Sequence, residues 1–170
     1  MKYKFGDIFE IKTNKGLAYI QYVNEYTDPP YYGSLIRILD GIFSERPTSF
    51  ADLVSKSELF YCFAPLMYKN QQKYFKKIGN EPVPKKFKTF PPFRMAGLNR
   101  DWDTGIVNDD WWIWENGVET KVGPINDRIK KIENLGATNL KAVKNAIERG
   151  YLPEKSIQIL GKAKGINIED

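Results

Sequence analysis

Four aspartates lie close together near the middle of this 170-residue sequence, at positions 101, 103, 109 and 110. Paired carboxylates can bind a hard cation or act as an acid and a base. The segment DWDTG, however, lacks both the spacing of a calcium loop and its final bidentate glutamate. We therefore interpret these aspartates as a solvated acidic loop ahead of a hairpin, and we expect no metal site there.

Other groups that could do chemistry are scarce. The sequence contains no histidine, which removes the imidazole base and the histidine metal ligand. Its single cysteine, Cys62, cannot form an intrachain disulfide, and its place in the apolar run LFYCFAPLMY predicts a buried thiol. No glycine-rich loop matches the phosphate-binding fingerprints. We therefore expect a protein that is not an enzyme and that carries no cofactor.

The four tryptophans lie within 13 positions of one another, at 102, 111, 112 and 114. On a strand, Trp112 and Trp114 would share one face and Trp111 the other. One face is expected to be core, which leaves a large aromatic side chain partly exposed beside carboxylates. Such a composition is typical of anchors for a protein partner, although core packing alone is the alternative for any single tryptophan.

The net charge of +5 is unevenly distributed. Residues 66–100 hold nine basic residues and one acidic residue, whereas residues 101–127 hold one basic and seven acidic. Two such blocks can steer a charged partner or neutralise each other in the fold. The basic segment Lys69 to Arg94 has interleaved aromatic residues that could hold a phosphate backbone and stack bases. Nucleic-acid binding is therefore an alternative function. The alternative without a binding role is a solvated, lysine-rich surface.

Antiparallel strands are predicted at the N-terminus. DIFEIKT and LAYIQYV are rich in branched and aromatic residues, and Asn14-Lys15-Gly16 between them favours a hairpin. A third strand, SLIRIL, follows the loop EYTDPPYYG, which we expect to expose Tyr26, Tyr31 and Tyr32. The short apolar run Glu58 to Ala64 predicts a central strand.

Helices are expected in the middle of the chain and at its end. Helical spacing of apolar residues predicts a helix from Pro65 to Gly79. An extended proline-rich connection follows over 80–93, and the Asn-Gly of WWIWENGVETKV predicts a hairpin over 109–122. Beyond Gly123 the apolar stripes are those of helices. The last two helices partly match a helix-turn-helix.

This order of elements predicts an α+β fold with an N-terminal antiparallel sheet, strongly bent or barrel-like, and helices at the middle and C-terminus. We expect a sheet domain over residues 1–124 with one inserted helix, and a helical extension over 125–170 packed on it. No segment has about 18 apolar residues in a row, and the N-terminus lacks the apolar stretch of a signal peptide. We therefore expect a cytoplasmic protein that does not bind membranes.

Several segments, taken in order, resemble the bacterial immunity protein 26 family. They are FGDIFEI, LAYIQYV, YYGSLIRILD, FPPFRMAG, DDWWIWENG and VGP, which together span roughly residues 4–124. Members of that family are encoded beside polymorphic toxins and are thought to neutralise them. The resemblance implies a non-catalytic protein that binds a cognate toxin domain, and it supplies no catalytic residues. After Pro124 the family pattern implies a closing tryptophan-containing strand, where this sequence has lysine-rich helices.

The leading hypothesis is thus an immunity protein that binds its toxin through exposed aromatic residues and charged loops. The expected partner-binding residues are Tyr31, Tyr32, Arg94, Trp102, Asp109, Asp110 and Trp111. Burial of two or three such anchors, each contributing about 2 kcal/mol or more, would give tight binding. The alternative is a nucleic-acid-binding protein that uses the basic segment 69–94.

Overall fold

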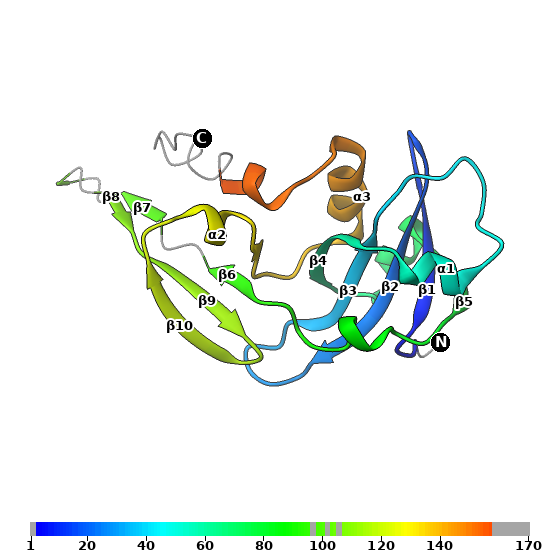
Figure 1. Cartoon of the computed structure of the whole chain (residues 1–170), viewed down its shortest axis with the longest axis horizontal. Helices are drawn as coiled ribbons and strands as arrows, with labels where there is room; N and C mark the ends of the chain where they lie inside the picture. Colours follow the sequence, from blue (N-terminus) through cyan, green and yellow to red (C-terminus); the bar gives the residue numbers. More distant parts are fainter. Residues whose placement is uncertain (1–2, 96–97, 101–102, 105–106, 158–170) are drawn as a thin grey trace. The chain divides into compact units, whose positions relative to one another are not determined.

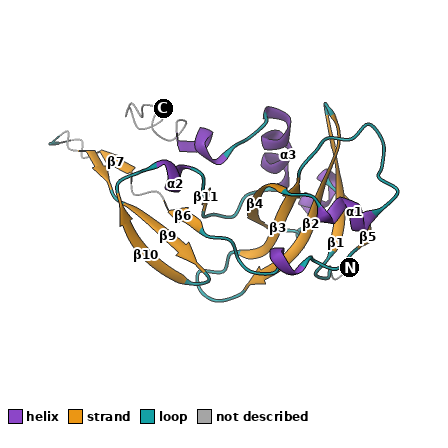
Figure 2. Ribbon diagram, viewed as in Figure 1, coloured by secondary structure: helices purple, strands orange, loops and turns teal. Residues whose placement is uncertain are grey.

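The computed structural model describes residues 3–95, 98–100, 103–104 and 107–157. The fold is α+β, as predicted: antiparallel strands dominate, and short helices lie in the middle and toward the end of the chain (Figures 1 and 2). Within the described ranges, no helix has the length and apolar character needed to span a bilayer.

The chain divides into two compact units. Unit 1 comprises Met1–Phe90 and Gly136–Tyr151, and unit 2 comprises Pro91–Leu135 and Leu152–Asp170. This division differs from the expected sheet domain over 1–124 with a helical extension over 125–170. The reason is that the C-terminal part of the chain contributes to both units. Residues 136–151, which include the helix Leu140–Arg149, belong to unit 1, and the residues before and after them belong to unit 2.

Unit 1 is built on a five-stranded antiparallel sheet in the order β4-β3-β2-β1-β5. Its strands are β1 (Asp7–Thr13), β2 (Gly16–Tyr26), β3 (Gly33–Leu39), β4 (Glu58–Ala64) and β5 (Lys76–Asn80). The pairing of Thr13 with Gly16 leaves Asn14 and Lys15 as the turn, so the predicted first hairpin is confirmed. The sheet is open, because β4 and β5 lie at its two edges.

One face of this sheet is covered by α3 (Leu140–Arg149). Its apolar stripe of Leu140, Val143 and Ile147 packs against the core residues that β1 to β4 turn toward it. The Asn139 side chain caps the helix by accepting a hydrogen bond from the Ala142 backbone N–H at 2.9 Å. Gly150, at φ 65°, ends it in the left-handed conformation that glycine adopts without strain. For this element the helical pattern predicted beyond Gly123 is thus confirmed.

The opposite face is covered by α1 (Phe50–Ser55), whose Leu53 and Val54 pack with Ile8 and Tyr19 of the hairpin. Ser49 caps this helix, since its Oγ accepts a hydrogen bond from the Asp52 backbone N–H at 3.1 Å.

The expected helix from Pro65 to Gly79 is wrong. In its place are the 3₁₀ helix η1 (Lys69–Tyr74) and the strand β5. Strand β5 pairs with β1 and so satisfies backbone groups along that edge of the sheet, which outweighs the local helical spacing. Gly79 is not a helix stop: a Cβ there would lie 2.4 Å from the Phe50 ring, so glycine permits a close approach. Strand β4 is likewise an edge strand, not a central one.

Unit 2 contains a four-stranded sheet in the order β10-β9-β6-β11, and a separate pair of strands. The sheet strands are β6 (Phe93–Met95), β9 (Trp111–Glu115), β10 (Val118–Gly123) and β11 (Glu133–Asn134), and the pair is β7 (Leu98–Arg100) with β8 (Val107–Asp109). Asn116 and Gly117 have φ values of 48° and 88°, the conformation of a tight hairpin turn, so the predicted β9–β10 hairpin is confirmed.

The first helix expected after Gly123 is shorter than its apolar stripe suggests. α2 (Asp127–Lys130) is a single turn, and β11 then pairs in parallel with β6. Residues 153–157 are helical, and the rest of the helical extension predicted over 125–170 lies outside the described residues.

Candidate functional site

The loop between β2 and β3 holds Tyr31, the most exposed of the expected anchors that the structure describes. Tyr31 presents 77% of its surface to solvent. Its neighbour Tyr32 is half-buried, because its ring stacks on Phe63 of β4 with a centroid separation of 5.2 Å. Tyr26, which was also expected to be exposed, is buried and lies edge-on to the Phe90 ring. The loop therefore exposes Tyr31, while the neighbouring rings of Tyr26 and Tyr32 pack against other aromatic side chains.

Arg94 is not a surface residue, which corrects its assignment as a partner contact. It lies on β6, is fully buried and donates to backbone carbonyls of α2 and of the 153–157 helix within unit 2. Its Nε also donates to Asn134 Oδ1 at 2.9 Å. The guanidinium supplies hydrogen bonds to backbone carbonyls at helix ends, where the helix itself leaves such groups without a partner. The role of Arg94 is therefore structural.

Trp111 is also fully buried, so it is not an exposed anchor. Its ring packs with Ile129 and Ile157, and its Nε1 donates to Asp109 Oδ1 at 2.5 Å. The other carboxylate oxygen of Asp109 accepts from the Ile125 backbone N–H at 3.1 Å. Asp109 therefore joins Trp111, at the start of the β9–β10 hairpin, to Ile125, which follows the hairpin.

The alternation expected along β9 fails because each of its two faces holds one buried tryptophan. Trp111 and Trp114, on opposite faces, are both buried, and Trp112 is the tryptophan of this strand that reaches solvent, with 38% of its surface exposed. Beside it, Asp110 Oδ2 forms an ion pair with Lys121 Nζ of β10 at 2.7 Å. The remaining expected anchor, Trp102, lies outside the described residues.

Two further exposed apolar side chains follow the end of β4, which lies at the same end of the sheet as the start of β3. Met67 and Tyr68 follow the end of β4 and are 52% and 66% exposed. Ser34 of β3 pairs with Ala64 of β4, so the residues just before β3 and just after β4 leave the sheet at the same end. We call Tyr31, Met67 and Tyr68 the Tyr31–Tyr68 surface. Sequence reasoning missed Met67 and Tyr68 because it placed them in a helix that does not form.

Two buried carboxylates of unit 1 are held by cations. Asp7 pairs with Lys77 Nζ at 2.7 Å, and although burial raises its pKa, hydrogen bonds from Lys77, from the Lys4 backbone and from Asn80 bring that pKa below its usual range. The two oxygens of Glu10 accept from Arg46 at 2.9 and 3.2 Å, and these bonds lower the pKa of Glu10 against the opposing effect of burial. Both groups are ionised at neutral pH and join neighbouring segments.

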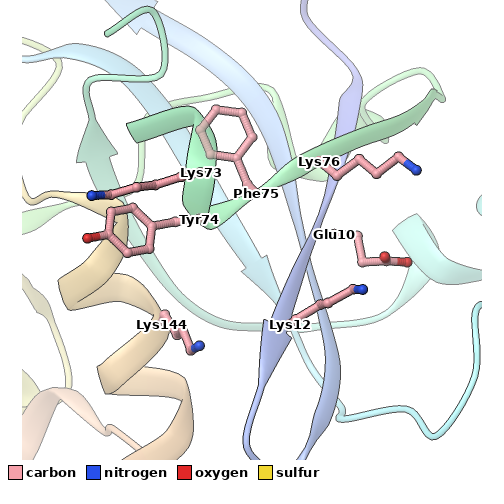
Figure 3. A pocket seen from close by; sticks show the side chains of 7 residues that line it. All are labelled: Glu10, Lys12, Lys73, Tyr74, Phe75, Lys76 and Lys144. Carbon is pink, nitrogen blue, oxygen red and sulfur yellow. The ribbon is translucent and has the colours of Figure 1, made fainter. Parts of the chain in front are cut away.

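Arg94 adds nothing to a surface formed by the basic segment 69–94, although the lysines of that segment are exposed. Lys77 is paired with Asp7, Lys86 Nζ lies 4.4 Å from the centre of the Phe87 ring, and Arg94 is buried in unit 2. Lys73 and Lys76 are among the residues that line a pocket of unit 1 (Figure 3).

Comparison with protein-family models, with curated proteins and with solved structures gave no match to this chain.

Proposed function

We propose that this chain is a non-catalytic bacterial immunity protein of the cytoplasm that binds and neutralises a cognate toxin domain through the Tyr31–Tyr68 surface. The observation that carries the proposal is that Tyr31, Met67 and Tyr68 are each more than half exposed near one end of the β3–β4 pair. Large apolar side chains gathered in this way are characteristic of protein-binding surfaces, and tyrosine is enriched among the residues that dominate binding energy.

The local packing suits a binding role. The Tyr32 ring stacked on Phe63 holds the backbone next to Tyr31, so little conformational freedom of the loop is lost when a partner binds. Methionine adapts its shape to irregular partner surfaces. If Tyr31 and Tyr68 each contribute about 2 kcal/mol on burial, together they change the dissociation constant by about a thousandfold.

A toxin domain encoded in the reading frame directly upstream of this chain is the partner to test. Co-expression of the two should restore growth of cells that the toxin domain alone arrests, and the purified proteins should form a stable complex. Tyr31→Ala should weaken that complex by about 30-fold, because one anchor of about 2 kcal/mol is lost.

Val118→Ala is the matched control, since Val118 is 65% exposed but lies on β10 of unit 2. It should leave the complex unchanged. A complex that forms equally well with Tyr31→Ala and Tyr68→Ala would rule out this surface, and failure of the native chain to bind or protect would rule out the proposed function.

A further inference from the structure

Strand β10 forms an edge of the unit 2 sheet, where it pairs with β9 and with no other strand of that sheet (Figure 2). The residues from Val118 to Val122 are all exposed. Within the described part of the chain, their backbone groups have hydrogen-bond partners in β9 alone. An unpaired edge of this kind is a template to which a further strand can be added.

The β9–β10 hairpin determines which backbone groups of β10 point outward. Its two-residue turn makes Glu115 and Val118 the first pair, and such a pair exchanges both of its backbone hydrogen bonds. Hydrogen-bonded and non-hydrogen-bonded pairs then alternate along the hairpin, so the backbone of Thr120 also bonds to β9. Glu119 and Lys121 therefore direct their N–H and C=O groups toward the free edge.

Side chains of opposite charge lie on either side of Thr120. Because successive side chains of a strand alternate between its faces, Glu119 and Lys121 project from the same face. The Lys121 ammonium is held there by Asp110, whose Oδ2 lies 2.7 Å from Lys121 Nζ. An ammonium group has three donors, so this ion pair leaves Lys121 able to bind a second carboxylate.

We propose that β10 pairs with β10 of a second copy of this chain, antiparallel and about a twofold axis at Thr120. In this register Glu119 of each copy lies opposite Lys121 of the other. Each such pair joins the outward backbone groups of both residues and adds an ion pair between their side chains. Val118 and Val122, which are 65% and 38% exposed, meet across the axis at either end of the pairing. A twofold contact of this type closes on itself and gives a dimer.

The charge pattern favours a second copy as the occupant of this edge. The order Glu119, Thr120, Lys121 is complementary to itself when two copies run antiparallel. Strand β5 of unit 1 is the contrasting edge, because Lys76 and Lys77 are its charged residues and a second copy would offer only like charge. Lysines of this kind protect an edge from self-association. The alternating signs of β10 instead attract the same strand of another copy.

The proposed interface is small. Strand β10 has six residues, and its register with β9 shifts between Lys121 and Gly123, so the regular edge ends near Val122. A contact of this length buries less than the roughly 1,200 Å² of a stable specific interface. We therefore expect a reversible dimer with a dissociation constant on the order of 0.1 mM.

Sedimentation velocity of the full chain, from about 10 µM to about 1 mM, tests the proposal by bracketing the expected dissociation constant. The native chain should shift from monomer to dimer over this range. Glu119→Lys and Lys121→Glu should each weaken dimerisation by at least about tenfold, because each turns both attractive pairs into repulsive ones. An equimolar mixture of the two variants should dimerise about as well as the native chain, since each variant then meets the opposite charge at both positions.

Glu115→Lys is the matched control. Glu115 is exposed and lies in the same hairpin, but on β9 and not on the edge strand. This variant carries the same change of charge and should dimerise as the native chain does. Tyr31→Ala should also dimerise normally, because no residue of β10 belongs to the Tyr31–Tyr68 surface. Urea unfolding followed by tryptophan fluorescence verifies that each variant is folded.

Three results would overturn the proposal. The first is a native chain that stays monomeric up to about 1 mM, well above the expected dissociation constant; loss of the toxin complex on Glu119→Lys would then assign the edge to the toxin domain. The second is a dimer that Glu119→Lys and Lys121→Glu leave unchanged, which would place the contact on another surface. The third is a mixture of the two variants that stays monomeric, which would exclude the antiparallel register about Thr120.

Discussion

Arg37 and Arg94 are fully buried arginines, one in each unit. Arg37 donates to Gln21 Oε1 at 3.2 Å and to the carbonyl of Val54, and its guanidinium carbon lies 3.7 Å from the centre of the Phe87 ring. Burial lowers the pKa of Arg37 from its ordinary value. A buried guanidinium is tolerated when its five N–H groups find acceptors, so each arginine links segments that are distant in the sequence.

Replacing Arg94 by lysine should destabilise unit 2 by about 3 kcal/mol. Lysine keeps the charge but cannot reproduce the planar fork of donors, so buried carbonyls such as those of Ile129 and Pro153 lose their partner. Urea unfolding followed by tryptophan fluorescence measures the loss. Arg128→Lys, an exposed substitution in the same unit, should have almost no effect, and equal stability of the two variants would disprove the structural role of Arg94.

The sequence could not predict the role of Arg94 because its acceptors lie 35 to 62 positions away. It likewise could not decide which tryptophan of β9 is exposed, since strand alternation identifies the two faces and not whether both are covered. Tyr31 is different: its polar, proline-containing loop marked it as exposed, and it is. The same loop signal was right for Tyr31 and wrong for Tyr26, because the packing of Tyr26 against the distant Phe90 leaves no local signal.

Helix α3 is amphipathic and short, and its stability derives from the sheet it covers. Ile147 is buried in the core of unit 1. Ile147→Ala should lower the free energy of unfolding of unit 1 by about 3 kcal/mol, through lost burial and the cavity left behind. Chemical denaturation followed by tyrosine absorbance is the measurement. The exposed Lys141→Ala in the same helix should be neutral, and a loss no larger for Ile147→Ala would mean that α3 does not stabilise unit 1.

Elements with strong local signals were predicted well. Asn14-Lys15 and Asn116-Gly117 specify their hairpins through turn chemistry, and Gly150 specifies the end of α3. The segments predicted wrongly are those whose structure depends on a distant partner. Strand β5 exists because β1 offers an unpaired edge, and the two-residue β11 exists because β6 does.

At the scale of the whole molecule, the aromatic residues are segregated between the units. All ten tyrosines of the sequence fall within the bounds of unit 1, and all four tryptophans within those of unit 2. Tyrosine absorbance therefore follows unit 1, and tryptophan fluorescence follows unit 2. This separation allows the stability of each unit to be measured in the intact chain.

Alkaline pH should destabilise unit 1 more than unit 2. Burial raises the pKa values of Tyr19, Tyr22 and Tyr61 to about 12, from an ordinary value of 10.0. A raised pKa means that the folded state favours the neutral phenol, so this stabilisation is complete below pH 10 and is lost as the pH rises toward 12. Allowing for solvent screening, we expect unit 1 to lose about 2 kcal/mol by the middle of that range.

Denaturant midpoints measured from below pH 10 upward distinguish the two units. The midpoint from tyrosinate absorbance should fall steeply, and that from tryptophan fluorescence should fall less, because the tyrosines with raised pKa values all lie in unit 1. Tyr61→Phe should reduce the alkaline loss in unit 1, since the replaced ring can no longer ionise. Two midpoints that fall together would show that unfolding of the two units is coupled. A Tyr61→Phe chain that loses stability like the native chain would show that phenol burial does not cause the loss of stability at alkaline pH.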